Sequence, residues 1–262
     1  MGEDIRLDGK IAVVTGGGRG LGRAMALALV EAGANVIAAD IIGENLDQVA
    51  GEAAALANPG ANTGALAGVT ADIRQSGDCR RVVEAAHAHF GGLDILVNNA
   101  KGRFRYAPFE ELSAQDWDAM FRVTVRGSFL CAKAAAPGMR ARSYGKIINL
   151  ASGTVFKGAP GMLHYVTAKG ALVAMSRSMS RELGPDGICV NTVAPGLTLS
   201  ENILANQEIY GDAVQDAMIQ SRALKRAEVP DDLVGAVLFL ASPDSDFMTG
   251  QCMVVDGGSV NH

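Results

Sequence analysis

Short runs rich in β-branched residues alternate along the chain with longer stretches rich in Ala and Leu. Several of the short runs are apolar throughout, which is typical of parallel strands covered on both faces. The predicted strands are Ile11–Thr15, Val36–Asp40, Leu66–Ala71, Ile95–Asn98, Lys146–Leu150, Ile188–Ala194 and Cys252–Asp256. The predicted helices are Leu21–Ala32, Glu44–Ala57, Gly77–Phe90, Ala114–Arg142, Leu163–Leu183 and Asp231–Leu240.

This repetition predicts an α/β fold, a doubly wound parallel sheet with right-handed crossovers and helices on both faces. No repeat, low-complexity tract or linker interrupts it, so residues 1–262 are predicted to form one domain. The stretch between Pro195 and Pro230 does not fit the alternation. An insert of that length is more often a functional lid than a plain connection, the alternative being a pair of surface helices without a role. We therefore expect a substrate-binding loop at about residues 197–229.

Composition narrows the class of protein. Of 262 residues, 48% are apolar, and 23 Lys and Arg stand against 28 Asp and Glu, a net charge of −5. Disorder is thereby excluded, and a mildly acidic chain without a Lys/Arg run is not expected to bind nucleic acid. The four cysteines stand singly, which suits neither a disulfide framework nor a metal site and favours a reducing compartment. Without a signal peptide or membrane-spanning stretch, a cytoplasmic protein is expected.

The first predicted strand ends in a glycine-rich turn at which a helix begins. Such a backbone can approach a diphosphate closely, and the helix N-terminus offers free N–H groups and a positive dipole end. Because the first strand-to-helix turn of an α/β sheet is where dinucleotides bind, this turn predicts a dinucleotide site. Its candidate cofactor residues are Gly16, Gly18, Arg19, Gly20, Leu21 and Gly22.

Asp40, at the end of the second strand, indicates which dinucleotide binds. A carboxylate there accepts hydrogen bonds from the adenosine ribose and repels a 2′-phosphate, which favours NAD over NADP. Arg19 argues weakly for NADP, but its guanidinium can point to solvent. Asp72 and Ile73, after the third strand, are candidates for the adenine pocket. The alternative for Asp72 is an acid that initiates the next helix.

A second candidate site combines a hydroxyl, a phenol and an amine. Ser152 lies at the carboxyl end of the fifth strand, where α/β sheets keep their sites. Tyr165 and Lys169 are four residues apart and share one helix face. A nearby ammonium favours phenolate and lowers a phenol pKa of about 10. Ser152 can hold a substrate oxygen near that phenol, although a packed ring beside a solvated amine is the alternative for the pair.

Along its whole length the chain resembles the short-chain dehydrogenase/reductase family. The resemblance rests on both sites and on Asn98-Asn99-Ala100, Pro195-Gly196 and Val255-Asp256-Gly257-Gly258. It implies a Rossmann-type domain with a seven-stranded parallel sheet, a homotetramer, Tyr165 as general acid/base, Lys169 on the nicotinamide ribose and Ser152 at the substrate carbonyl. The other residues that it places along the cofactor are Asn98, Ala100, Pro195, Gly196, Thr198 and Ser200.

Two positions depart from the family pattern. Thr124 stands where the family usually has an Asn that holds a water linking Lys to solvent, so slower catalysis is expected. Its hydroxyl can bond water or its own helix carbonyl. Lys101 stands where the family usually has Gly, and with Arg103 and Arg105 it could attract an acidic substrate. The alternative is a solvated loop paired with nearby glutamates.

The predicted substrate pocket is apolar with some aromatic character, which favours a secondary alcohol or ketone of moderate size. Its candidate residues are Phe156, His164, Leu197 and Tyr210, with His164 on a different helix face from Tyr165. The tail Val260-Asn261-His262 resembles that of relatives that oxidise aromatic or alicyclic alcohols. We expect NAD-dependent hydride transfer between alcohol and ketone, without a metal. Reduction of a 3-ketoacyl thioester and a non-catalytic NAD-binding sensor remain as alternatives.

Overall fold

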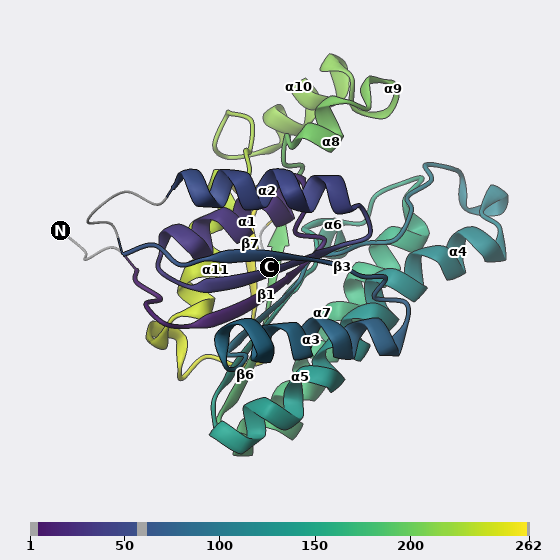
Figure 1. The fold of residues 1–262 in the computed structure, drawn as a ribbon. Coiled ribbons are helices and arrows are strands. Elements are labelled where there is room, and N and C mark those ends of the chain that lie inside the picture. Colours follow the sequence, from purple (N-terminus) through teal and green to yellow (C-terminus); the bar gives the residue numbers. More distant parts are fainter. Residues whose placement is uncertain (1–4, 57–61, 261–262) are drawn as a thin grey trace.

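The computed structural model describes residues 5–56 and 62–260, and it contains a seven-stranded parallel sheet of order β3-β2-β1-β4-β5-β6-β7 (Figure 1). The predicted fold class is thereby confirmed. The chain runs outward from β1 to β3 and then crosses to β4, so the sheet changes direction between β1 and β4, where α/β folds bind ligands. The strands are β1 (Ile11–Thr15), β2 (Asn35–Asp40), β3 (Leu66–Thr70), β4 (Ile95–Asn98), β5 (Gly145–Leu150), β6 (Ile188–Pro195) and β7 (Cys252–Val255).

Helices cover both faces of the sheet (Figure 1). Apolar residues of α1 and α11 pack on one face, and those of α3 and α5 on the other. The longer helices are α1 (Gly20–Glu31), α2 (Gly43–Ala55), α3 (Ser76–Phe90), α4 (Ala114–Phe121), α5 (Ser128–Arg142), α7 (Leu163–Leu183), α10 (Asp212–Ser221) and α11 (Asp231–Ala241). The short ones are α6 (Thr154–Lys157), α8 (Glu201–Leu204) and α9 (Gln207–Tyr210).

The central strands divide their side chains between two cores. Val13 and Leu96 belong to the core under α3 and α5, whereas Val14 and Val97 belong to the core under α1 and α11. Successive side chains of a strand point to opposite faces, so a strand covered on both sides must be apolar throughout. This is why the predicted strands appear in the sequence as continuous apolar runs.

The predicted helix Ala114–Arg142 is interrupted. A π-helical turn, Arg122–Gly127, separates α4 from α5. Such a turn adds a residue without ending the helix, so the apolar character of the stretch does not reveal it. A Cβ on Gly127 would lie 2.6 Å from the end of the Ile73 side chain, so a larger residue there would require Ile73 to shift. The predicted helix Glu44–Ala57 ends at Ala55, and Ala57 lies outside the described residues.

The segment 197–229 contains α8, α9 and α10, not one pair of helices. None of their residues is buried, and Figure 1 shows all three standing clear of the sheet. They contribute almost nothing to either core. In the described part of the chain, no helix is both long and apolar enough to cross a membrane.

Candidate active site

The glycine-rich turn connects β1 to α1 at the place where the sheet changes direction. Gly16 and Gly20 have φ of 64° and 57°, a region that favours glycine. A Cβ on Gly22 would lie 1.9 Å from the Gly16 carbonyl oxygen, so a side chain has no room there. Arg19 precedes α1, and its side chain makes no capping hydrogen bond to the helix N-terminus. The first N–H groups of α1 therefore remain free for an anion, as a dinucleotide diphosphate requires.

The turn is held from the neighbouring strand by Asn99, which was not among the predicted site residues. Its Nδ2 donates to the carbonyl oxygens of Thr15 (3.0 Å) and Gly16 (3.1 Å). The Thr15 hydroxyl in turn accepts from the Asn99 and Ala100 N–H groups, at 3.1 and 3.3 Å. Ala100 thus lies against the turn, and the only sequence signal for Asn99 is its place between two predicted residues.

Asp40 lies beside the glycine-rich turn. Its Oδ2 accepts from the Gly18 N–H and its Oδ1 from the Ile42 N–H, both at 3.2 Å. These bonds fix the carboxylate at the end of β2. Any group bound there must accept the proximity of a negative charge.

Asp72 and Ile73 are engaged elsewhere. The Asp72 carboxylate forms an ion pair with Arg74 at 2.6 Å, which lowers the pKa of Asp72. The Ile73 side chain is buried in the core under α3. Asp72 thus lies in the turn that leads into α3, and its place in an adenine pocket stays a prediction.

Ser152, Tyr165 and Lys169 come together at the carboxyl edge of the sheet. Ser152 follows β5 and lies close enough to the phenol of Tyr165, which extends from α7, to affect the pKa of that phenol. The Ser152 hydroxyl oxygen accepts from the Thr154 hydroxyl at 3.0 Å and from the Thr154 N–H at 3.3 Å. One turn further along α7, the Lys169 ammonium lies 5.8 Å from the centroid of the Tyr165 ring and donates to the Leu150 carbonyl oxygen. The structure therefore brings together all three residues that the sequence singled out.

The pKa values of this group differ from the expectation. Burial raises the pKa of Tyr165, and the nearby Ser152 hydroxyl offsets that effect only in part. Burial, together with the positive charge of Lys101, lowers the pKa of Lys169 to about 7. The phenol is thus not acidified, because both groups are too deeply buried to favour their charged forms.

Thr124 has other partners than expected. It is fully buried, and its hydroxyl accepts from the Gly102 N–H at 3.1 Å and donates to the Met120 sulfur at 3.3 Å. Its carbonyl oxygen accepts from the Ser128 hydroxyl at 2.8 Å. Among the described contacts, none joins Thr124 to Tyr165 or Lys169. Its side chain instead fixes the backbone immediately after Lys101.

Two of the basic residues after β4, Arg105 and Lys101, have different surroundings. Arg105 forms an ion pair with Asp116 at 2.9 Å and donates to the Glu111 carbonyl oxygen, which agrees with the solvated-loop alternative. Lys101 has no acidic partner among the described residues. Its neighbour Ala100 packs on the glycine turn, and its electrostatic interactions are with Arg19 and Lys169. Lys101 therefore carries its charge within electrostatic range of both the glycine turn and Lys169.

Of the predicted substrate residues, His164 packs inside the protein. It is fully buried and stacks on Phe104 with ring centroids 5.7 Å apart, and its Nε2 accepts from the Arg105 N–H at 3.4 Å. Phe156 packs beside the small core cluster that includes Val173. Tyr210, on α9, interacts electrostatically with Tyr165, and burial raises the pKa of Tyr210 to about 12.

The predicted cofactor residues after β6 lie along the same edge. Ser200 lies over the glycine turn, with its Cβ 3.7 Å from where a Cβ on Gly20 would lie. The hydroxyl of Thr198 donates to Glu228 at 2.7 Å, and the carbonyl oxygen of Leu197 accepts from Arg222. The N–H of Gly196, which follows Pro195, donates to the Val255 carbonyl oxygen at 3.2 Å.

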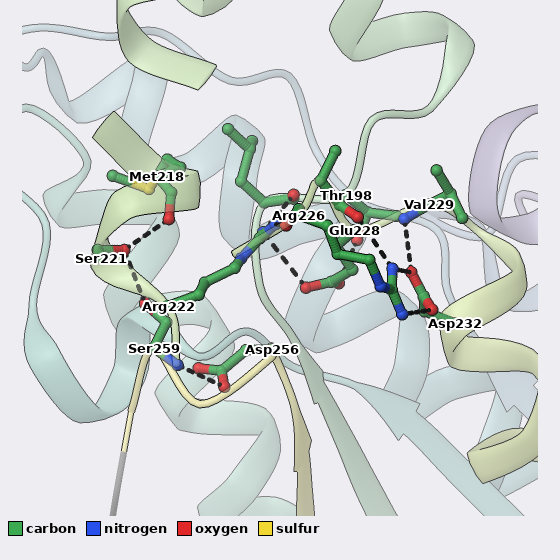
Figure 2. Close-up of polar contacts among 12 residues, drawn as sticks. Thr198, Met218, Ser221, Arg222, Arg226, Glu228, Val229, Asp232, Asp256 and Ser259 are labelled. Atoms are coloured by element: carbon green, nitrogen blue, oxygen red, sulfur yellow. Dashed lines mark hydrogen bonds and ion pairs between the residues drawn. The ribbon is translucent and has the colours of Figure 1, made fainter. Parts of the chain in front are cut away.

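Sequence reasoning missed two buried polar groups behind this edge. In one, Asn98 donates to Asn149 at 2.9 Å and Asn149 donates to Ser176 at 2.8 Å, so the predicted cofactor residue Asn98 is fully buried. The other joins Arg222 and Glu228 to the end of β7 (Figure 2). Polar residues inside otherwise apolar strands were the available signal for the first group, and the second had none.

The remaining expectations concern metals and the tail. No group of three or more His, Cys, Asp or Glu side chains within residues 5–56 and 62–260 could hold a metal ion. Asn261 and His262 lie outside the described residues.

Comparisons with known proteins agree with this arrangement. A family model described as enoyl-(acyl carrier protein) reductase matches residues 16–260. The chain is 34% identical to a D-threitol dehydrogenase of Mycolicibacterium smegmatis, over 97% of this chain and 94% of the relative. It is also 34% identical to a 3-oxoacyl-(acyl-carrier-protein) reductase of Thermotoga maritima, over 98% and 100%. A solved structure assigned as a short-chain alcohol dehydrogenase from Sinorhizobium meliloti 1021 superposes with a TM-score of 0.89 at 31% identity, covering 98% of both chains.

Proposed function

Because the chain belongs to the short-chain dehydrogenase/reductase family of oxidoreductases, we propose that it interconverts a secondary alcohol and a ketone, using NAD as hydride carrier. The observation that carries this proposal is the meeting of Ser152, Tyr165 and Lys169 beside a glycine turn shaped for a diphosphate. A binding module would have no use for a phenol held between a serine hydroxyl and a lysine.

The residues fit a dinucleotide cofactor at both ends of the groove. The turn and the free N-terminus of α1 would hold the diphosphate, and Asp40 the adenosine ribose. Lys169 and Tyr165 would face the nicotinamide ribose. The choice of NAD over NADP rests on Asp40, because a 2′-phosphate beside its carboxylate would bring like charges together.

The chain's own residues then supply the proton chemistry. Ser152 donates a hydrogen bond to the substrate oxygen and keeps it close to the phenol of Tyr165. Tyr165 accepts the hydroxyl proton of the alcohol in oxidation and returns it in reduction. Lys169 in its charged form favours the phenolate. A nicotinamide held beside these residues would supply the hydride acceptor in oxidation and the hydride donor in reduction.

The proposal extends to the class of substrate and to the oligomeric state of the protein. We propose that residues 197–229 form the substrate-binding loop, because α9 brings Tyr210 within electrostatic reach of Tyr165. A polyol or ketone of moderate size fits this reading, and the D-threitol dehydrogenase relative supports it. A homotetramer is proposed on the family resemblance alone, and a cytoplasmic location on the four cysteines that stand singly in the sequence.

Replacing Tyr165 by Phe tests the proposal. Removing the phenolic oxygen deletes the proton acceptor, so turnover with a panel of secondary alcohols should fall at least 1,000-fold, within the range of acid/base catalysis. NADH binding, followed by its fluorescence, should change less than twofold. Near-normal turnover in Tyr165→Phe would contradict the assignment, and NADH binding without turnover in the wild type would favour the sensor alternative.

One observation favours the 3-ketoacyl thioester alternative. A hollow beside the start of α3 is lined by Arg74, Gln75, Arg122 and Arg126, a basic surface that would suit an acidic carrier protein. The reductase relative from Thermotoga maritima acts on such a substrate by its name. Parallel assays with a 3-ketoacyl thioester and with simple ketones separate the two functions.

A further inference from the structure

Both ends of the segment 197–229 meet over charged side chains that are almost fully buried (Figure 2). Arg222 and Glu228 are 4% and 5% exposed, and Asp256, at the end of β7, is 4% exposed. Charged residues are seldom buried to this degree unless they are paired. These three lie beneath residues 197–200, the stretch proposed to line the nicotinamide end of the groove.

Arg222 ties the beginning of the segment to its end. Its Nη2 donates to the Leu197 carbonyl oxygen at 2.7 Å, and its Nη1 donates to the Arg226 carbonyl oxygen at 3.0 Å. The same Nη2 lies 3.4 Å from Oε2 of Glu228. A planar guanidinium presents its N–H donors in a rigid fork, whereas the three donors of an ammonium rotate at the end of a flexible stem.

Glu228 holds Thr198 and Leu199, the two residues that follow Leu197. Its Oε1 accepts from the Thr198 hydroxyl at 2.7 Å, and its carbonyl oxygen accepts from the Leu199 N–H at 2.7 Å. Thr198 and Glu228 also form an isolated parallel bridge. A Cβ on Gly196 would lie 2.5 Å from Glu228 Oε2, so the carboxylate packs directly against the backbone that leads into the segment.

Asp256 places a second buried carboxylate near Glu228. Its Oδ1 accepts from the Gly258 and Ser259 N–H groups, both at 3.0 Å, whereas its Oδ2 is buried without a partner among the described residues. Of the two buried carboxylates, Glu228 is the one that forms an ion pair with Arg222. The charge of Glu228 is costly in this position, and burial raises its pKa, with Asp256 adding to the effect.

We infer that Arg222 and Glu228, here called the Arg222–Glu228 clasp, are positioning residues that hold residues 197–200 in the conformation required by the nicotinamide half of the cofactor. The inference rests on the proposed function, which places Thr198 and Ser200 along that half. The adenosine half is supported independently, by the glycine turn, Asn99 and Asp40. The clasp should thus affect one half of the cofactor and not the other.

Two ligands separate the halves. NADH engages both halves of the groove, whereas ADP-ribose lacks the nicotinamide ring and depends on the glycine turn and Asp40. The test variant is Arg222→Met/Glu228→Met, which removes both buried charges while keeping apolar volume, a replacement that is often neutral for stability. The matched control is Arg226→Met, which breaks the exposed ion pair with Asp232 in the same segment.

The expected result is a split between the two ligands. In the double variant, the Kd for NADH should rise about tenfold, the effect of losing one or two hydrogen bonds, and the Kd for ADP-ribose should change less than twofold. The control should change neither. Equal weakening of both ligands, or of neither, would overturn the inference. If the double variant fails to fold, Arg222→Lys must show the same difference between the two ligands, although a smaller one. If Arg222→Lys shows no such difference, the inference is overturned.

A pH series adds a readout that simple loss of structure would not produce. Protonation of Glu228 removes the charge that faces Arg222, and the other charged groups around it are Arg226, Asp232 and Asp256. As pH falls, NADH affinity should weaken more than ADP-ribose affinity, and Glu228→Gln should abolish that difference. An unchanged pH dependence in Glu228→Gln would contradict the role of Glu228.

Failure of the inference is distinguishable from failure of the proposed function. Wild-type protein that binds neither NADH nor ADP-ribose would remove the proposed function and the inference with it. Wild-type protein that binds both ligands, and variants that show no split, would remove the inference alone.

Discussion

The two sides of the groove are held in place by different physical means. On the side of β1, β4 and β5, the site residues extend from strands whose side chains fill two apolar cores. On the side of residues 197–229, three exposed helices depend on the buried polar contacts at their base. The first side is stabilised by buried apolar area, so few of its residues can be substituted. On the second side, the exposed residues can be substituted freely, but the buried charged residues beneath the helices cannot.

The largest effect is expected from Gly22→Ala, on the side of the site that is formed by strands. The added methyl group would sit 1.9 Å from the Gly16 carbonyl oxygen, so the turn must open. We expect dinucleotide binding, measured with both NADH and ADP-ribose, to weaken more than 100-fold. Gly51→Ala is the control, because nothing lies within 4 Å of a Cβ at that exposed helical position, and it should bind both ligands normally.

Asp40→Ala should come next in size. Removing the carboxylate deletes the acceptor for the ribose and the repulsion against a 2′-phosphate, so the preference for NAD over NADP in kcat/KM should fall about 100-fold. Asp47→Ala, an acidic residue elsewhere on α2, serves as the control. An unchanged preference in Asp40→Ala would show that another group selects the cofactor.

A pair of valines compares the two sides directly. Val13→Ala opens a cavity in a fully buried strand and should lower the free energy of unfolding by about 2 kcal/mol. Val214→Ala, on α10, is 40% exposed in the wild type and should cost less than about 0.5 kcal/mol. Urea unfolding measures both. Equal losses would mean that the exposed helices are more closely integrated than their burial indicates.

The smallest effect concerns the charge of Lys101. Replacing Lys101 by Met removes the repulsion on Lys169, so the Lys169 pKa should move upward from about 7, although burial still holds it below its usual range. Titration of the labelled lysine side chains by NMR in the cofactor-free protein measures this. Arg103→Met is the control, and an unmoved Lys169 in Lys101→Met would place the two lysines out of electrostatic contact.

The same shift has a consequence for stability. Because the folded pKa of Lys169 is depressed, the unfolded chain binds more protons between about pH 7 and the ordinary lysine pKa of 10.5. The contribution of Lys169 to the free energy of unfolding therefore rises with pH across that window. Lys169→Met should flatten this part of the pH dependence.

The fold and the catalytic group were predictable because each has a local signal. Parallel strands covered on both faces must be apolar throughout, and a helix sets Tyr165 and Lys169 on one face whatever surrounds them. The pKa shifts of Tyr165 and Lys169 were not predictable, because they depend on how deeply each side chain is buried, which sequence spacing does not show. Thr124 shows the same limit, since its hydroxyl accepts from the N–H of Gly102, which lies 22 residues earlier in the loop after β4.

The base of the segment also bears on how the protein can be altered. Leu199 and Glu228 are hydrogen-bonded to each other, so the chain leaves the body of the protein and returns to it at the same point. The entropy of closing such a loop grows only slowly with its length, by about 0.6 kcal/mol for each doubling. The intervening helices can accordingly be exchanged as a cassette, provided that the two junctions are kept, which makes this segment the natural place to graft a new substrate preference.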